Sequence, residues 1–195
     1  MNPNPREKPA LLIIDMVKDN FDEKRDLPIT SRARELIAPI NRLSRAFREA
    51  GWPVVFATDA FKRDDFLFQG KLSAHSLEGT EGAEPIDALE RTEEDLWLPK
   101  PRFSAFFKTG LEDWLKERGV SLCAVAGITT NFCVLTTAMD AICSDFKTVI
   151  LEDCATAALP GVHEQTLDLY RRNVLYPLLR VLTSDQLLDE LGAGC

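Results

Sequence analysis

Cys133 is the residue of this chain best placed to act as a nucleophile. It follows the apolar run 122–126 and lies in or near the first turn of a helix that we expect over 130–143. At a helix start the free backbone N–H groups and the helix dipole favour a thiolate and can bind a developing oxyanion. The alternative is a small buried apolar residue, the commonest state of a free cysteine. Cys154, which also ends a predicted strand, is the nearest rival.

Two charged residues also stand at the ends of predicted strands. Asp15 follows the apolar run 11–14, and Lys100 follows the run 96–99 within a Pro-Lys-Pro sequence. A lysine beside a thiol and a carboxylate could lower the pKa of the thiol and screen negative charge. Taken singly, Asp15 could equally cap a loop or a helix, and Lys100 could be a solvated surface residue. Position alone makes both residues candidates without deciding between these roles.

The chain has two histidines, His75 and His163, so a histidine base or a zinc site with several imidazoles has few residues to draw on. His75 lies in a long loop downstream of Asp59, Asp64 and Asp65. One imidazole with irregularly spaced carboxylates could bind a divalent metal, but a solvated acidic loop is the simpler interpretation. His163 lies at a predicted helix start, and the sequence suggests no role for it.

Alternating strands and helices must position these residues. Continuous apolar runs predict buried strands, and amphipathic stretches between them predict helices. The strands are expected over 9–16, 53–59, 96–99, 122–126, 148–151 and 178–182. This alternation predicts a single α/β domain over 1–195. We expect three layers (α/β/α, Rossmann-like), with a mostly parallel sheet of about six strands and the active site at its carboxyl edge.

Several local sequence features predict details of the helices and loops. The helix over 31–50 should kink at Pro39. Thr109 and Glu112 should form a capping box, and Ser184 should cap a short C-terminal helix. The segment 61–85 lacks a clear period and is expected to be a long functional loop.

Composition excludes several classes of function. The 195 residues carry a net charge of −8, which argues against a nucleic-acid partner. No apolar run approaches the roughly 18 residues of a membrane span, and the polar N-terminus lacks a signal peptide. Five scattered cysteines favour a reducing cytoplasm over a disulfide framework. No P-loop, G-x-G-x-x-G or G-x-S-x-G motif is present.

Three stretches resemble the isochorismatase-like cysteine hydrolases. They are LLIIDMVKDNF at 11–21, KPRFSAFFKTGLEDWL at 100–115 and AVAGITTNFCVLTTAMDA at 124–141. They occur in the order and spacing of the family, so the resemblance covers nearly the whole chain. The segment GTEGAE at 79–84 is similar to a glycine-rich stretch of the nicotinamidase-like members, which are therefore expected to be the nearest relatives.

The resemblance implies a catalytic triad of Asp15, Lys100 and Cys133. It also implies a cis peptide between Ile128 and Thr129, which turns the Thr129 N–H toward the oxyanion beside the Cys133 N–H. In the implied mechanism Asp15 takes the thiol proton, the thiolate attacks an amide carbonyl, and water hydrolyses the thioester. We expect hydrolysis of a small-molecule amide, or of a ureide or N-carbamoyl compound, without a required cofactor. Family members are commonly dimers or tetramers, so a homo-oligomer is expected.

Two other functions remain as alternatives. Isochorismatase-type cleavage of a vinyl ether does not need a cysteine nucleophile, and family members devoted to it often lack one. A non-catalytic scaffold or partner-binding member would be expected to have a broken triad, whereas all three residues are present.

The sequence departs from the nicotinamidase pattern at two places. Those enzymes bind zinc through an Asp-x-His pair and a later histidine, whereas here the pair reads Asp59-Ala60-Phe61. Asp59 and His75 alone would hold zinc weakly, which argues against nicotinamide as the substrate. Val17 replaces the usual glutamine after Asp-Met and should make the pocket less polar. Phe21, Phe61 and Phe106 are then expected to form an apolar wall for the substrate.

Overall fold

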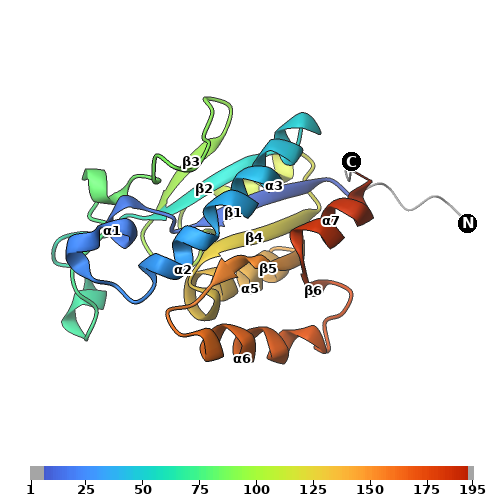
Figure 1. Ribbon diagram of the computed structural model, residues 1–195. Helices are drawn as coiled ribbons and strands as arrows, with labels where there is room; N and C mark the ends of the chain where they lie inside the picture. The colour runs from blue at the N-terminus through green and yellow to red at the C-terminus, as the bar shows by residue number, and fades with distance from the viewer. Residues whose placement is uncertain (1–6, 193–195) are drawn as a thin grey trace, which may run out of the picture.

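The computed structural model of the protein, which describes residues 7–192, is built around one central sheet (Figure 1). The ends of the predicted domain, 1–6 and 193–195, lie outside the described residues. Six strands form the sheet: β1 (Pro9–Ile14), β2 (Val54–Asp59), β3 (Leu96–Lys100), β4 (Leu122–Ile128), β5 (Lys147–Thr156) and β6 (Leu179–Leu182). Their order is β3-β2-β1-β4-β5-β6, and every neighbouring pair is parallel. The predicted three-layer α/β fold is therefore confirmed.

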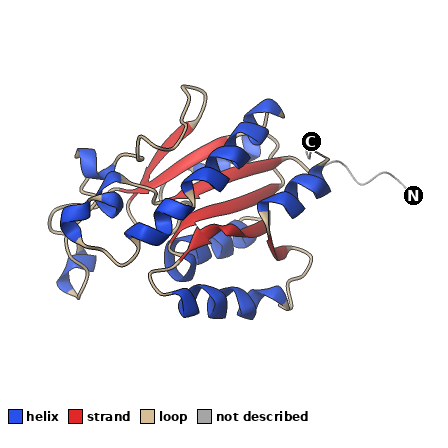
Figure 2. Cartoon of the chain, in the orientation of Figure 1, coloured by secondary structure: helices blue, strands red, loops and turns tan. Residues whose placement is uncertain are grey.

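Helices cover both faces of the sheet (Figure 2). One face packs against α2 (Thr30–Glu35), α3 (Ile37–Glu49) and α7 (Ser184–Leu191). The opposite face packs against α4 (Leu111–Glu117), α5 (Leu135–Cys143) and α6 (Pro160–Arg171). Every residue of β1 and β4 is buried, as expected for central strands that have apolar neighbours on both sides. The continuous apolar runs of the sequence thus become the core of the molecule.

The predicted helix over 31–50 is interrupted rather than kinked. It consists of α2 and α3, which are separated at Leu36. Pro39 lies in the first turn of α3 and has no N–H to donate to the carbonyl group four residues earlier, so the ladder of hydrogen bonds breaks there.

Two predicted helix caps are wrong. Gly110, with φ of 75°, is the N-cap of α4; the Thr109 hydroxyl donates to the Ala105 carbonyl at 2.6 Å and accepts from the Leu111 N–H at 3.3 Å, without the reciprocal Glu112 bond of a capping box. The Glu112 carboxylate accepts from Lys116 and Ser144. At the other end of the chain, Thr183 rather than Ser184 caps α7. The Ser184 hydroxyl donates to Asp153 at 2.6 Å.

The segment between β2 and β3 lacks long regular elements, as predicted, and contains η2 (Phe66–Gln69) and η3 (Glu81–Ala83). Before α2 the chain forms α1 (Lys18–Phe21) and η1 (Glu23–Arg25), two short turns that the sequence did not reveal. The GTEGAE segment packs against α1 and not in the pocket: a Cβ on Gly82 would lie 2.4 Å from the Asp19 carboxylate. Among residues 7–192, no helix is long and apolar enough to cross a bilayer.

Candidate active site

The carboxyl ends of four neighbouring strands bring the predicted catalytic residues together. Asp15 directly follows β1, and Asp59 and Lys100 are the last residues of β2 and β3. Cys133 lies in η4 (Thr130–Val134), a π-helical turn between β4 and α5. Because β3, β2, β1 and β4 are consecutive in the sheet, residues more than one hundred positions apart in the sequence meet at one edge.

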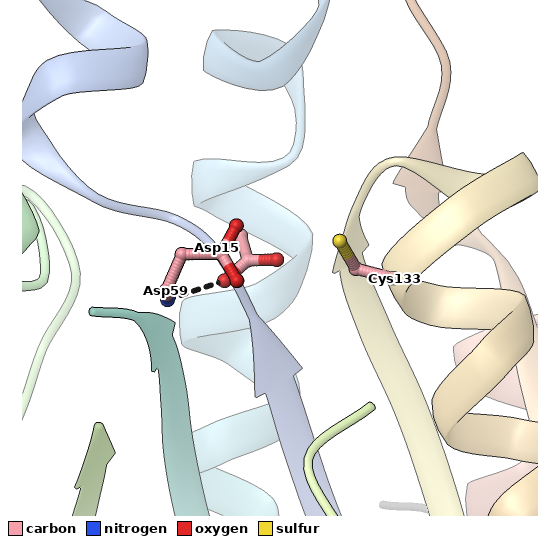
Figure 3. A group of neighbouring side chains, drawn as sticks. All are labelled: Asp15, Asp59 and Cys133. Atoms are coloured by element: carbon pink, nitrogen blue, oxygen red, sulfur yellow. Dashed lines mark hydrogen bonds between the residues drawn. The ribbon is translucent and has the colours of Figure 1, made fainter. Parts of the chain in front are cut away.

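A buried network of hydrogen bonds connects the three charged side chains. Lys100 Nζ donates to Asp15 Oδ2 at 2.9 Å and also to Asp59 Oδ1. The backbone N–H of Asp59 donates to Asp15 Oδ1 at 2.8 Å, the bond drawn in Figure 3. The third Lys100 donor is used by the Arg102 carbonyl, at 3.2 Å. Lys100 is fully buried, so its ammonium belongs to this network and not to the protein surface.

Cys133 faces the two carboxylates. Its Sγ and one carboxylate oxygen each of Asp15 and Asp59 all lie within 4.8 Å of one another. Figure 3 shows the aspartates side by side and the cysteine across from them, at the start of the helix that follows β4. Cys154, the rival candidate, is a fully buried member of the apolar core. Of the buried thiols in the described chain, Cys133 is the one placed beside a carboxylate and an ammonium on the pocket side.

Local backbone geometry sets the position of Asp15. Its φ of 53° lies in the left-handed region, which aspartate tolerates better than most residues. The Asn20 side-chain amide donates to the Asp15 carbonyl at 3.0 Å and holds the turn. Gly127 of β4 lies so close to β1 that an added Cβ would be 2.1 Å from the Ile14 oxygen, and its φ is 102°. Only glycine allows the two strands to approach this closely just before the site.

Burial and charge determine the protonation states of the site. Burial, followed by the negative charge of Asp15, raises the pKa of the Cys133 thiol well above its ordinary value, so the resting cysteine is protonated. This differs from the thiolate expected from the helix start. Burial opposes the charge on Lys100, but the negative charges of its neighbours, Asp15 first, outweigh it and raise the pKa of the ammonium. Burial and the Asp15 charge raise the pKa of Asp59 to about 7.

The network forms the base of a largely apolar cavity of about 400 Å³. Its apolar lining includes Ile29, Phe61, Leu67, Leu72, Phe103 and Phe132. Asn20, Lys71 and His75 add polar groups, and Ile128 and Thr129 also line the cavity. The peptide bond between those two residues is cis.

The predicted aromatic wall is only partly correct. Phe61 lines the cavity, but Phe21 packs against the core on the α2–α3 face. Phe106 packs against Phe146 in the opposite layer, with ring centroids 6.0 Å apart. Val17 is fully buried and pairs with Pro85 outside the cavity lining, so it does not set the polarity of the pocket. The sequence prediction failed because the spacing of phenylalanines does not show which face of a turn they occupy.

Phe103 and Phe132 are the aromatic residues that the sequence prediction missed. Their rings lie 5.9 Å apart at the cavity, and Phe132 is 56% exposed. Phe132 immediately precedes Cys133, and Phe103 follows Lys100 by three positions. Proximity in sequence to the catalytic candidates was therefore the usable signal.

The residues present do not fit the zinc site of nicotinamidase-like members. The Asp59 carboxylate already accepts from Lys100, and the His75 Nδ1 lies 2.9 Å from the Ser73 backbone oxygen. The Phe61 ring, which stands at the position of the missing histidine, packs edge-on against His75 with centroids 5.3 Å apart. Of the other two carboxylates, Asp64 is exposed to solvent and Asp65 pairs with Arg102 at 2.9 Å.

Known proteins resemble this chain over most of its length. A family model described as the isochorismatase domain matches residues 9–185. A probable inactive nicotinamidase of Arabidopsis thaliana is 33% identical over 181 residues, which cover 87% of this chain and 92% of that protein. The ureidoacrylate amidohydrolase RutB of Klebsiella pneumoniae is 28% identical over 187 residues, which cover 82% and 78%. The crystal structure of N-carbamoylsarcosine amidase from Thermoplasma acidophilum has a TM-score of 0.79 and 29% identity, with 91% and 97% covered.

Proposed function

The chain belongs to the isochorismatase family of hydrolases, as its motifs predicted, and we propose that it cleaves the C–N bond of a small amide through a cysteine thioester. The observation that carries the proposal is the convergence of Asp15, Lys100 and Cys133 at the base of one cavity. Nucleophilic hydrolysis needs a thiol, a base near it and a fixed positive charge, and these three side chains supply them.

Acylation begins with the neutral Cys133 thiol. As the substrate carbonyl approaches, Asp15 removes the thiol proton while Lys100 offsets the charge of the carboxylate and of the sulfur. The thiolate adds to the carbonyl carbon, and the backbone N–H groups of Thr129 and Cys133 stabilise the oxyanion. The tetrahedral intermediate then expels the amine, which takes its proton from Asp15, and leaves a thioester on Cys133.

Deacylation reverses these roles. Asp15 takes a proton from water, the hydroxide adds to the thioester carbonyl, and the Cys133 thiolate leaves and is reprotonated. The fixed orientation of the Asp15 carboxylate supports both steps. One of its oxygens accepts from Lys100 and the other accepts from the Asp59 backbone, so the carboxylate cannot turn away from the thiol.

We infer a ureide or N-carbamoyl compound as the substrate class. Both ureidoacrylate amidohydrolase and N-carbamoylsarcosine amidase have names that denote a carbamoyl group bound to nitrogen. In nicotinamidase-like members, zinc is expected to orient the pyridine nitrogen of nicotinamide. The zinc ligands are incomplete in this chain, which argues against nicotinamide as the substrate. The apolar cavity suits a small substrate whose polar end reaches Cys133, and Lys71 provides a cation in the lining.

The other two functions have less support. Vinyl-ether cleavage makes no use of a cysteine nucleophile, and a scaffold makes no use of an intact triad. Here the three side chains form a fully buried or nearly fully buried network that opens to a cavity. Burying such a network costs free energy because its charges lose contact with water. A catalytic role accounts for this cost better than the binding of a partner at the surface.

We further propose a cytoplasmic homo-oligomer, a dimer or tetramer. The free cysteines Cys123, Cys133, Cys143 and Cys154 suit a reducing compartment. Leu169, Val174 and Tyr176 expose 74%, 97% and 70% of their surfaces along and just after α6, and these apolar groups would gain by association. Sedimentation velocity distinguishes the oligomer from a monomer.

Ammonia release tests the proposed function. The panel contains N-carbamoyl amino acids, ureides, aliphatic amides and nicotinamide, each assayed with added zinc and with a chelator. We expect activity on carbamoyl compounds that neither treatment changes. Cys133→Ala should lower turnover by roughly a thousandfold or more while preserving the fold, whereas Cys143→Ala, which removes an exposed free cysteine, is the matched control. An active Cys133→Ala protein would refute the mechanism, and zinc-dependent activity would refute the assignment of the metal site.

A further inference from the structure

A buried hydroxyl just before the nucleophile is bound by a histidine from another element. Thr130 is fully buried and opens η4, and its Oγ1 lies 2.8 Å from Nδ1 of His163. His163 lies in the first turn of α6, with its backbone N–H bonded to the Leu159 carbonyl. A buried hydroxyl without a partner destabilises a protein by roughly 1–3 kcal/mol, so this contact accounts for the position of the ring.

The turn that Thr130 opens carries the reacting groups. Cys133 lies three residues after Thr130, and the residue just before Thr130 is Thr129, which borders the cavity. The backbone oxygen of Thr129 accepts from Phe132 and Val134, and that of Thr130 accepts from Leu135. Any change in the position of Thr130 therefore moves the thiol and the proposed oxyanion N–H groups together.

The other side of the imidazole faces β5. The Glu152 backbone on this side favours a proton on the ring, and a neutral ring that carries its proton on the nitrogen away from Thr130 leaves Nδ1 free to accept from the Thr130 hydroxyl. Burial lowers the pKa of His163, which favours this neutral form near pH 7. The charges around the ring are Glu152 from β5 and Glu164 and Arg171 from α6. Arg171 pairs with Glu152 at 2.6 Å and with Glu164 at 3.5 Å, which partly neutralises them.

We propose that His163 is a positioning residue for the hydrolysis, which holds η4 in its reactive arrangement by accepting a hydrogen bond from Thr130. This rests on the proposed function, because it assigns the turn to a cysteine hydrolase. His163 is not among the residues that line the cavity, and the hydrogen bond that joins its ring to η4 is the one to Thr130, so we assign its effect to that bond. The sequence suggested no role for this histidine, since its partner lies 33 positions away on a different element.

A double-mutant cycle tests the link. Thr130→Val and His163→Ala should each lower kcat by about three- to tenfold, the range of one lost hydrogen bond, with little change in KM. Combining them should lower kcat no further than the stronger single change. Thr130→Ser and His163→Asn, which keep a hydroxyl or an acceptor near the same place, should retain most of the wild-type kcat. Gln165→Ala, an exposed position on α6, is the matched control.

Alkylation by iodoacetamide provides a readout that needs no substrate. Cys133 is only 8% exposed, so loosening η4 should speed its alkylation by about three- to tenfold in Thr130→Val and in His163→Ala. The exposed Cys143 of the same chain serves as the internal standard, and its rate should not change. Peptide mass spectrometry separates the two sites.

The pH profile distinguishes positioning from simple stabilisation. The ratio of wild-type to His163→Ala kcat should be constant above pH 7, where the ring is neutral, and should decrease only below pH 6.5, because burial lowers the pKa of His163 and a protonated Nδ1 no longer accepts from Thr130. Independent, additive losses in the double mutant, or variants that lower only the melting temperature, would overturn the proposal. If no substrate of the panel is hydrolysed by the wild type, the proposed function fails, but a coupled change in the Cys133 alkylation rate would still support the Thr130–His163 link and an uncoupled one would refute it.

Discussion

Replacing Lys100 by methionine isolates the role of the ammonium in the buried network. Methionine is similar in length and apolar, so the change removes the charge with little loss of packing volume. In the wild type the ammonium donates to both Asp15 and Asp59 and is fully buried. Without it, two carboxyl groups face each other in a region that is almost closed to water.

The expected loss of stability follows from this geometry. Removing one partner of a buried ion pair typically costs about 3–5 kcal/mol, because the remaining charge is left unpaired. For a chain of this size each kcal/mol corresponds to roughly 2–4 °C in melting temperature, so Lys100→Met should melt about 6–20 °C lower near pH 8. Turnover should also be lost, because the ammonium no longer offsets the charge that develops on Cys133.

The loss should depend on pH with a defined sign. Even with Lys100 present, burial and Asp15 raise the pKa of Asp59 to about 7 in the folded protein, compared with about 4 in an unfolded chain. Removing the ammonium raises the folded-state pKa further. A carboxyl group whose pKa is higher in the folded protein than in the unfolded chain destabilises the folded state. This destabilisation grows as the pH rises from the unfolded-state pKa to the folded-state pKa. Lys100→Met should therefore lose less stability near pH 5 than near pH 8.

Chemical unfolding at the two pH values measures the effect. Lys116→Met is the control, since Lys116 forms an exposed pair with Glu112 one turn away, and its removal should cost about 0.5 kcal/mol or less. Adding Asp59→Asn to Lys100→Met removes one of the two carboxylates that are left without the ammonium, and it should restore part of the stability at pH 8. A Lys100→Met protein as stable as the wild type at pH 8, or a loss that is equal at both pH values, would refute the reasoning.

Two further substitutions test the backbone and the pocket. Gly127→Ala places a Cβ 2.1 Å from the Ile14 oxygen at a φ of 102°, so it should destabilise the fold by roughly 3 kcal/mol in urea unfolding, and a near-neutral result would contradict the close approach of β1 and β4. Lys71→Met should raise KM about fivefold for carbamoyl substrates that carry a carboxylate and leave uncharged amides unaffected in steady-state kinetics, and an equal effect on both would exclude charge recognition by Lys71.

The fold and the meeting of the catalytic candidates could be predicted because both depend on the sheet. Continuous apolar runs identify central parallel strands, and the carboxyl ends of neighbouring strands lie at one edge. Asp15, Lys100 and Cys133 each follow such a run, so their convergence required no knowledge of side-chain packing. The family motifs then added the cis peptide at Ile128, which no spacing argument could supply.

The remaining features depend on long-range contacts that a linear pattern does not encode. Phe21 and Phe106 are aromatic residues near the motifs, yet α1 and the turn after β3 point them into opposite core layers. Thr109 and Glu112 have the spacing of a capping box, but Gly110 is the N-cap of α4, and the Glu112 carboxylate accepts from Ser144. Cys133 is a thiol and not the expected thiolate, because burial, followed by the charge of the nearby Asp15, raises its pKa, and neither burial nor this proximity is visible in the sequence.

The order of the strands also makes the site depend on the assembled sheet. Lys100, Asp15 and Cys133 belong to segments that meet only when β3 has paired with β2, β2 with β1, and β1 with β4. Each of these pairings joins strands that are distant in sequence, so none forms through local contacts alone. In a chain whose strands are not yet paired, Cys133, Asp15 and Lys100 are therefore held apart, and the proposed nucleophile meets its partners only when four strands are in register.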